Sequence, residues 1–187
     1  MTVQEIIKKR RTVRKFTQER ISDDVLLGLI DGARYAASGA NLQPLKYRIL
    51  NDEKTVEAVF PYTKWAGYTP GETPKAGERP TAFIAVFGDR EIRKDFECDA
   101  GASITNMILL AEDKGIGACW LGSVDRKKVM EILDVDTERF ELVYLVAMGY
   151  PAQKSEVVEC VDKNIKYYLT DDGVLKVPKR SLDEILI

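Results

Sequence analysis

Two continuous apolar runs limit the folds open to this chain. Residues 81–87 read TAFIAVF between a proline and a glycine, and residues 142–148 read LVYLVAM and are followed by a glycine. A strand whose residues are apolar without alternation is typically buried on both faces, so each run predicts a strand inside a covered sheet. Helical patterns before and between the runs supply the covering layers. The chain is therefore expected to have an α+β fold with one central sheet flanked by helices.

Helix and turn signals place the remaining elements. Ser22 is a suitable N-cap for a helix beginning at the next residue, because two acidic residues follow it. Residues 61–80 contain four prolines and three glycines, which predicts an irregular loop that either caps a site or wraps a partner. Residues 152–187 are more polar, with a turn at 171–173. Helices are predicted over residues 3–10, 23–37, 54–60, 93–114 and 125–133, and further short strands over 47–50 and 118–121.

Composition narrows the functional classes. With 187 residues, 45% of them hydrophobic and 31% charged, the chain is expected to form a single globular domain over residues 1–187. No apolar run reaches the roughly 18 residues of a membrane helix, and the charged N-terminal segment lacks the apolar stretch of a signal peptide. A soluble cytoplasmic protein is therefore expected. The net charge of −2 argues against nucleic-acid binding by bulk charge.

The sequence contains no histidine. Ser/His and Cys/His nucleophile systems, most catalytic zinc sites and the usual proton shuttle near neutral pH are therefore excluded. Cys98, Cys119 and Cys160 form no CxxC pair, so they are expected to be ordinary reduced thiols rather than disulfides or metal ligands. No metal and no catalytic side chain are predicted. If the chain is an enzyme, its chemistry must come from something other than histidine.

The most concentrated charge lies near the N-terminus, where residues 8–15, KKRRTVRK, contain six basic side chains. Three interpretations are open: a solvated helix end, a patch for nucleic acid or membrane, and a site for one anionic ligand. Arg10 and Arg14 are four residues apart with the Thr12 hydroxyl between them, and arginine forks suit a phosphate. Lys179 and Arg180 form a second basic group that would meet the same phosphate if the tail folds back.

Glycine-rich phosphate loops are not found. Gly115, Gly117 and Gly122 lack the GxGxxG spacing, and no GxxxxGKS/T motif occurs. A dinucleotide-binding fold and a P-loop NTPase are therefore not expected.

Two segments in the first quarter of the chain resemble motifs of the FMN-dependent nitroreductase family. Residues 10–16, RRTVRKF, look like the family's N-terminal RRSxRxF motif. Residues 37–44, ASGANLQP, resemble its PSxxNxQPW motif, with Ala37 in place of the usual proline and Leu45 in place of the usual tryptophan.

Later segments extend this resemblance in the family's order. Stretches within residues 99–122 are similar to the family's long central helix and to the strand behind the flavin. Residues 177–182, VPKRSL, look like its C-terminal phosphate-binding end. The resemblance covers nearly the whole chain. It implies a central mixed sheet flanked by helices, in an intertwined homodimer with FMN sites at the interface.

The resemblance also implies roles for particular residues. Arg10, Thr12 and Arg180 would hold the phosphate, Arg11 and Val13 would line the site through their backbone, and Arg14 would face the pyrimidine edge of the flavin. Residues 38–41 would approach the ring from the other subunit, and the end of the 118–121 strand would lie beside the ring with a backbone N–H near N5. The residues implied to bind FMN are Arg10, Arg11, Thr12, Arg14, Ser38, Gly39, Asn41, Leu121, Gly122, Lys179 and Arg180.

A flavin carries its own redox chemistry, so a chain without histidine can still be an oxidoreductase. The resemblance implies an enzyme that takes hydride from NADH or NADPH and reduces a nitroaromatic, quinone or similar acceptor by a ping-pong mechanism. The alternatives are related flavin chemistry, such as reductive dehalogenation or flavin breakdown, and a flavin-binding protein without turnover.

Overall fold

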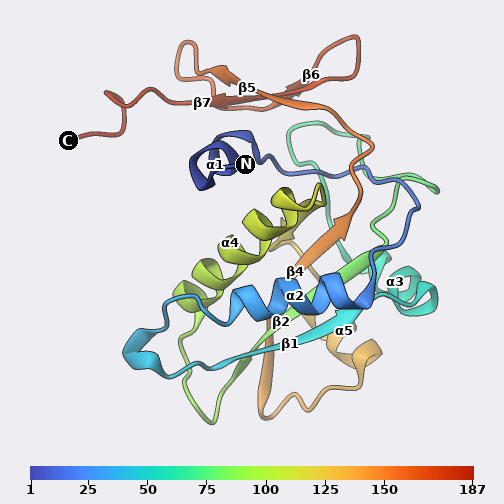
Figure 1. Ribbon diagram of the computed structural model, residues 1–187. Helices are drawn as coiled ribbons and strands as arrows, with labels where there is room; N and C mark the ends of the chain where they lie inside the picture. The colour runs from blue at the N-terminus through green and yellow to red at the C-terminus, as the bar shows by residue number, and fades with distance from the viewer.

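The computed structural model describes all 187 residues (Figure 1). Its helices are α1 (Val3–Lys9), α2 (Asp23–Ala33), η1 (Gly39–Asn41), α3 (Glu53–Val59), η2 (Phe60–Tyr62), α4 (Glu97–Asp113) and α5 (Arg126–Leu133). Its strands are β1 (Leu45–Leu50), β2 (Ala82–Asp89), β3 (Gly117–Leu121), β4 (Phe140–Gly149), β5 (Ser155–Glu159), β6 (Tyr168–Leu169) and β7 (Leu175–Lys179). No helix of the chain is both long enough and apolar enough to cross a membrane.

The two apolar runs form the inner strands of the main sheet. This four-stranded sheet has the order β1-β2-β4-β3, and its neighbouring strands are antiparallel. Ile84 in β2 lies opposite Val146 in β4, and every residue of β2 is buried. The predicted α+β class is confirmed. Parallel pairing enters the main sheet at its outer edge, where Thr12 forms a bridge with Ala118 of β3.

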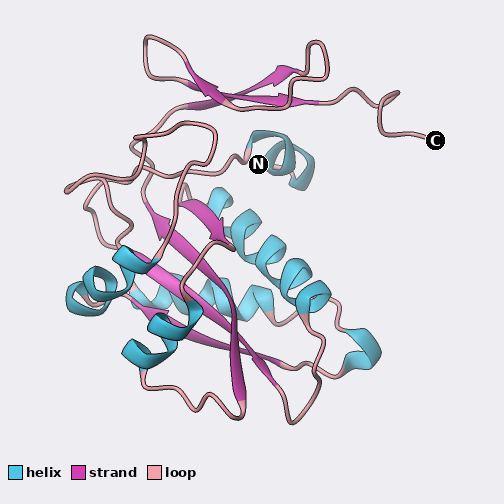
Figure 2. Ribbon diagram, turned by 180° about the vertical axis from the view of Figure 1, so that it is seen from behind, coloured by secondary structure: helices cyan, strands magenta, loops and turns pink.

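Helices cover both faces of the main sheet, as Figures 1 and 2 show from opposite sides. On one face, α2 and α4 pack against the sheet through residues such as Leu29 and Ile104. On the other face, α3 and α5 contribute Val59 and Val129 to a second apolar cluster. Continuous apolar strands are required because each inner strand contributes side chains to both clusters.

Two predicted helix boundaries are wrong. The second helix ends at Ala33 rather than near residue 37, because the N–H groups of Tyr35 and Ala36 bond to carbonyls three residues back and tighten the chain into a turn. The long central helix begins at Glu97 rather than at residue 93, because the N–H groups of Ile92 and Arg93 both donate to the Asp89 carbonyl.

The polar tail forms a second sheet that the sequence pattern does not predict. This three-stranded sheet has the order β5-β7-β6, with β5 parallel and β6 antiparallel to β7. The predicted turn at 171–173 connects β6 to β7, and Gly173 takes the left-handed conformation there with φ +78°. Figure 1 shows this sheet beyond α1 and apart from the main sheet. Its strands are short and mostly exposed or half-buried, so they carry no clear hydrophobic period.

Candidate functional site

The basic segment, residues 10–15, leaves α1 and runs along the outer edge of the main sheet. Arg10 ends the helix with φ −55° and ψ 124°, while its N–H still donates to the Ile6 carbonyl. The Val13 N–H then donates to the Ala118 carbonyl at 3.0 Å. Val13 can approach this closely because Gly117 has no side chain; an added Cβ would lie 2.8 Å from the Val13 side chain. The segment is therefore held against β3.

Arg10 and Arg11 are half-buried cations. Burial lowers the pKa of Arg10 below its usual value, and the Glu112 carboxylate partly opposes that lowering. Burial also lowers the pKa of Arg11, and repulsion from Arg10 adds to the effect. The Arg11 guanidinium folds back to donate to the Lys8 carbonyl at the end of α1. Two partly desolvated positive charges side by side would be stabilised by an anion.

Arg14 is held differently from its neighbour Lys15. The Arg14 guanidinium lies 4.7 Å from the centroid of the Tyr167 ring, and its backbone N–H donates to Gln153 Oε1 at 3.3 Å. Lys15 Nζ forms an ion pair with Glu72 at 2.6 Å, and this hydrogen bond raises the pKa of Lys15. Lys15 is therefore neutralised within the chain, whereas Arg10, Arg11 and Arg14 form no ion pair with any carboxylate.

The basic segment contacts the start of β3 at Gly117 and Ala118, whereas Leu121 and Gly122 lie at the other end of that strand. Leu121 is buried and Gly122 is exposed immediately after the strand. Burial raises the pKa of the Cys119 thiol to about 11, and the positive charge of Arg14 partly lowers it. This thiol is therefore protonated at neutral pH and is no nucleophile. The structure thus places the basic segment along the start of β3, and the role of each residue toward a ligand stays a prediction.

The loop that contains Ser38, Gly39 and Asn41 is organised by a buried carboxylate that the sequence analysis misses. Ser38 Oγ donates to Asp99 Oδ2 at 2.5 Å, and the Gly39 N–H donates to Asp99 Oδ1 at 3.2 Å. Asp99 also lies 3.9 Å from Arg93 Nη1. An acid in the first turn of a helix is too common to reveal this role, and the two partners are 61 residues apart.

Gly39 and Asn41 have distinct local constraints. A Cβ on Gly39 would lie 2.4 Å from Arg93 Nη1, so the absence of a side chain admits the arginine. Asn41 is exposed and adopts φ +55°, in the left-handed region that asparagine tolerates. A cavity of about 260 Å³ opens beside the loop, with Ser38, Tyr47 and Asp99 among its lining residues.

Within one chain, this loop lies far from the basic segment. Asp99 lies in the first turn of α4, whereas Lys9 forms an ion pair with Glu112 in the last turn at 3.0 Å. The rise of an α-helix separates those two turns by about 20 Å. The predicted Lys179 and Arg180 lie at and beyond the end of β7, where Arg180 pairs with Glu184 at 3.5 Å. No hydrogen bond or ion pair connects them to residues 10–14.

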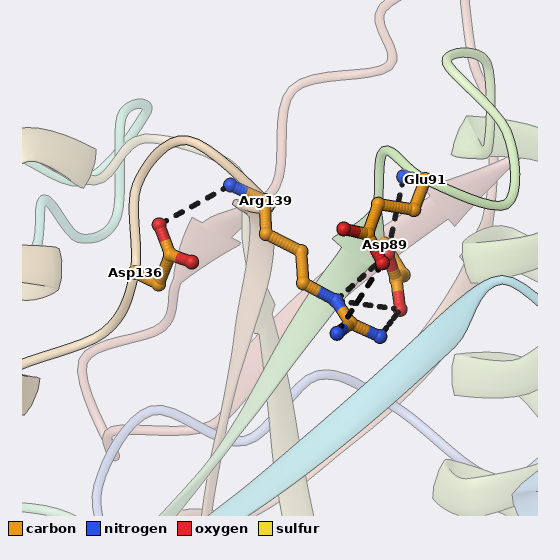
Figure 3. A network of polar contacts seen from close by, with 4 residues as sticks. All are labelled: Asp89, Glu91, Asp136 and Arg139. Carbon is orange, nitrogen blue, oxygen red and sulfur yellow. Dashed lines mark hydrogen bonds and ion pairs between the residues drawn. The ribbon is translucent and has the colours of Figure 1, made fainter.

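A second charged cluster, the Asp89 network, is closed by its own partners (Figure 3). The fully buried Asp89 carboxylate accepts hydrogen bonds from Arg139 Nη2 at 2.8 Å and from the Glu91 N–H at 3.1 Å. Arg139 also pairs with Glu91 at 3.3 Å, and its backbone N–H donates to Asp136. Hydrogen bonding to Arg139 holds the pKa of Asp89 below its usual 3.8. This network fastens the end of β2 to the start of β4.

Comparison with known proteins adds a family match. The model described as the Nitroreductase family matches residues 7–150. A candidate NADH dehydrogenase/NAD(P)H nitroreductase of Archaeoglobus fulgidus is 27% identical over 167 residues, covering 84% of this chain and 90% of that protein. A candidate NAD(P)H nitroreductase of Bacillus subtilis, YfhC, is 28% identical over 173 residues, covering 83% of this chain and 87% of that protein.

Solved structures agree with the sequence matches. A candidate nitroreductase of Desulfovibrio desulfuricans, crystallised in complex with FMN, superposes with a TM-score of 0.76 at 25% identity. The superposition covers 100% of this chain and 96% of that one. The fold implied by the sequence resemblance is therefore confirmed.

Proposed function

The chain belongs to the nitroreductase family of oxidoreductases, and on that premise we propose that it binds FMN and uses NADH or NADPH to reduce a small-molecule acceptor. The acceptor class is a nitroaromatic, a quinone or a similar compound, reduced in a ping-pong cycle. Residues 1–187 act as one FMN-binding domain in this proposal, and the protein works in the cytoplasm. The observation that carries it is the row of three arginines without ion-pair partners along the edge of β3.

The side chains on this edge fit the proposed cofactor. Arg10 is half-buried with its charge disfavoured by burial, so a phosphate would compensate a cost that the free chain bears. Thr12 adds a hydroxyl, and the Arg14 guanidinium makes no hydrogen bond within the chain and can meet the polar edge of a flavin. Leu121 and Gly122 would lie beside the ring. When bound, FMN supplies the transfer of electrons from the nicotinamide to the acceptor.

The protein completes this site as a homodimer in our proposal. Ser38, Gly39 and Asn41 lie at the opposite end of α4 from the basic segment, so within one chain they are too far away to share a cofactor. A second copy would bring Ser38 of the partner subunit to the flavin. Lys179 and Arg180 of one subunit would likewise reach the FMN phosphate in the dimer.

Exposed apolar side chains support a dimer. They include Val3 and Ile7 on α1, Tyr35 after α2, and Leu182 and Leu186 in the C-terminal tail. A cavity of about 530 Å³ between α1, α2 and α4 is lined mainly by apolar residues, including Leu109 and Leu110. An apolar cavity rimmed by exposed apolar side chains such as Val3 and Tyr35 is typical of an interface between subunits.

Anaerobic spectroscopy tests the function. The purified protein is expected to be yellow with about one FMN per subunit, and NADH or NADPH should bleach the flavin until an acceptor restores its colour. A panel of nitroaromatics, quinones, halogenated aromatics and free flavins then separates reduction of the proposed acceptors from dehalogenation and flavin breakdown. Bound flavin that neither nicotinamide bleaches would indicate a binding protein without turnover. Protein that remains colourless with added FMN would refute the proposal.

Sedimentation of the FMN-loaded protein tests the assembly. A dimer is expected at concentrations where the flavin remains bound. A monomer that retains FMN with full affinity would contradict the shared site.

A further inference from the structure

Arg14 is held by an aromatic side chain from outside the region that the family model matches. The match ends at residue 150, whereas Tyr167 lies in the tail, immediately before β6. The Arg14 guanidinium lies 4.7 Å from the centroid of the Tyr167 ring. This distance is typical of a cation–π contact. The tail therefore acts on the basic segment through Tyr167.

Tyr167 is itself fixed by the irregular segment 61–80. The Tyr68 N–H donates to the Tyr167 hydroxyl oxygen at 3.3 Å. The two rings also contact each other, with centroids 5.1 Å apart and planes inclined by 57°. Gln153, earlier in the tail, accepts the backbone N–H of Arg14. Arg14 thus lies where three segments that are distant in the sequence converge.

An aromatic partner has a different electrostatic effect from a carboxylate. Lys15 shows the alternative, because its ammonium group is neutralised by Glu72 at 2.6 Å. A tyrosine ring attracts the guanidinium through its negative face but carries no net charge. Arg14 therefore keeps a full positive charge and its N–H donors for a ligand, while the ring restricts the rotamers that the long side chain samples.

We propose that Tyr167 is a positioning residue that holds the Arg14 guanidinium ready for the bound flavin, with Tyr68 fixing the tyrosine in turn. This inference rests on the proposed function, because it assumes that Arg14 faces the flavin. Tyr167 needs no contact with the cofactor. Its effect on FMN is transmitted through Arg14, so removing Arg14 should abolish it.

The test measures FMN affinity by fluorescence quenching and the flavin midpoint potential by titration against a reference dye. Tyr167→Leu removes the aromatic face and is expected to weaken FMN binding roughly two- to fivefold, the usual range for a cation–π contact at a partly exposed site. Its midpoint potential should shift in the same direction as that of Arg14→Ala. Tyr167→Phe keeps the ring and its contact with the Tyr68 ring but loses the hydroxyl that accepts from the Tyr68 N–H, so its loss of FMN affinity should be smaller than that of Tyr167→Leu.

A double-mutant cycle separates positioning from a general loosening of the tail. In the Arg14→Ala background, Tyr167→Leu should cause no further change in affinity or potential. Tyr168→Leu is the matched control, since it removes an exposed tyrosine from the adjacent position, and it should leave both quantities unchanged. Circular dichroism checks folding, and Tyr167→Gln replaces Tyr167→Leu if the latter does not fold.

The outcomes of this cycle are distinct. If Tyr167→Leu matches the original chain, or if its effect persists in full without Arg14, the positioning role is refuted while the proposed function stands. If the original chain binds no FMN, the proposed function fails and this inference fails with it. A shift that requires Arg14 supports the inference.

Discussion

The Asp89 network and the basic segment differ in whether their charges are paired within the chain. In the network, the buried Asp89 carboxylate meets Arg139, and Arg139 also meets Glu91, so both signs of charge come from the chain itself (Figure 3). In the basic segment, Arg10, Arg11 and Arg14 form no ion pair, and the Glu112 carboxylate only partly offsets the burial of Arg10 and Arg11. A partly buried charge without an opposite charge is costly, and folds rarely retain one without a ligand or a function. The comparison therefore supports a stabilising role for the first cluster and, under the proposed function, a binding role for the second.

The two clusters also lie at opposite ends of the main sheet. Asp89 pairs with Phe140 at the start of β4, whereas Phe16, just after the basic segment, contacts Gly149 at its end. An extended strand of that length separates its ends by about 30 Å. Substitutions in one cluster should therefore leave the other nearly unchanged, which makes the contrast testable.

The largest effect is expected for Arg10→Ala. Truncating one partner of a desolvated charge pair typically costs about 2–5 kcal/mol, so FMN should bind at least roughly 30-fold more weakly. The free protein should lose little stability, because Arg10 makes no ion pair in it. Fluorescence titration with FMN measures the affinity, and thermal unfolding without FMN measures the stability. An unchanged FMN affinity would show that the unpaired Arg10 guanidinium does not bind the phosphate.

The converse result is expected for Asp89→Asn. The substitution leaves the exposed Glu91 as the only carboxylate paired with Arg139 and should lower the melting temperature by several degrees, with FMN affinity little changed. The pH dependence has a defined sign. Because Arg139 lowers the pKa of Asp89 in the folded state, the carboxylate stabilises the protein above its usual pKa of 3.8, and that contribution is lost as pH falls through the folded-state pKa. The variant should therefore lose less stability than the original chain on acidification below about pH 4.

A smaller effect is expected for Asp99→Asn, because Asp99 is paired within the chain like Asp89 but lies beside a segment proposed to bind the flavin. Asp99 is a buried carboxylate with partners inside the chain, yet those partners are Ser38 and Gly39 of the loop proposed to reach the neighbouring flavin. Hydrogen bonds to a charged acceptor contribute about 1.5–3 kcal/mol each, and asparagine retains part of this interaction. Stability should fall by about 1–2 kcal/mol, with weaker FMN binding. Cys98→Ser is the control, since it changes the adjacent exposed residue. If Asp99→Asn lowers stability but leaves FMN affinity unchanged, Asp99 has no role in the flavin site.

The sequence predicted those parts of the molecule that have a local signal. The inner strands are uniformly apolar because helices cover both faces, and a run such as TAFIAVF is hard to accommodate anywhere but in a covered strand. The basic segment was visible as a charge cluster. Contacts between distant segments could not be predicted from the sequence, because they produce no periodic pattern in it. Examples are the hydrogen bonds from Ser38 and Gly39 to Asp99 and the packing of the Tyr167 ring on Arg14. The tail sheet escaped prediction for the same reason, since its short strands bury only a few side chains.

The smallest effect is expected for Arg14→Ala. Reduction of a bound flavin adds negative charge, so a fixed cation beside it favours the reduced form. A unit charge pair about 4 Å apart at an effective dielectric constant near 20 is worth about 4 kcal/mol. For a two-electron couple, about 30 mV corresponds to 1.4 kcal/mol, so the ceiling is roughly 90 mV.

Solvent at this open edge should reduce that ceiling to some tens of millivolts. Lys15 cannot replace the lost charge, because Glu72 neutralises it at 2.6 Å. The midpoint potential of Arg14→Ala should therefore fall, while FMN remains bound more firmly than in Arg10→Ala. Lys15→Ala is the matched control and should leave the potential nearly unchanged. A redox titration of both variants decides the point: a potential for Arg14→Ala that is unchanged or higher would mean that this charge serves the phosphate or the solvent rather than the flavin edge.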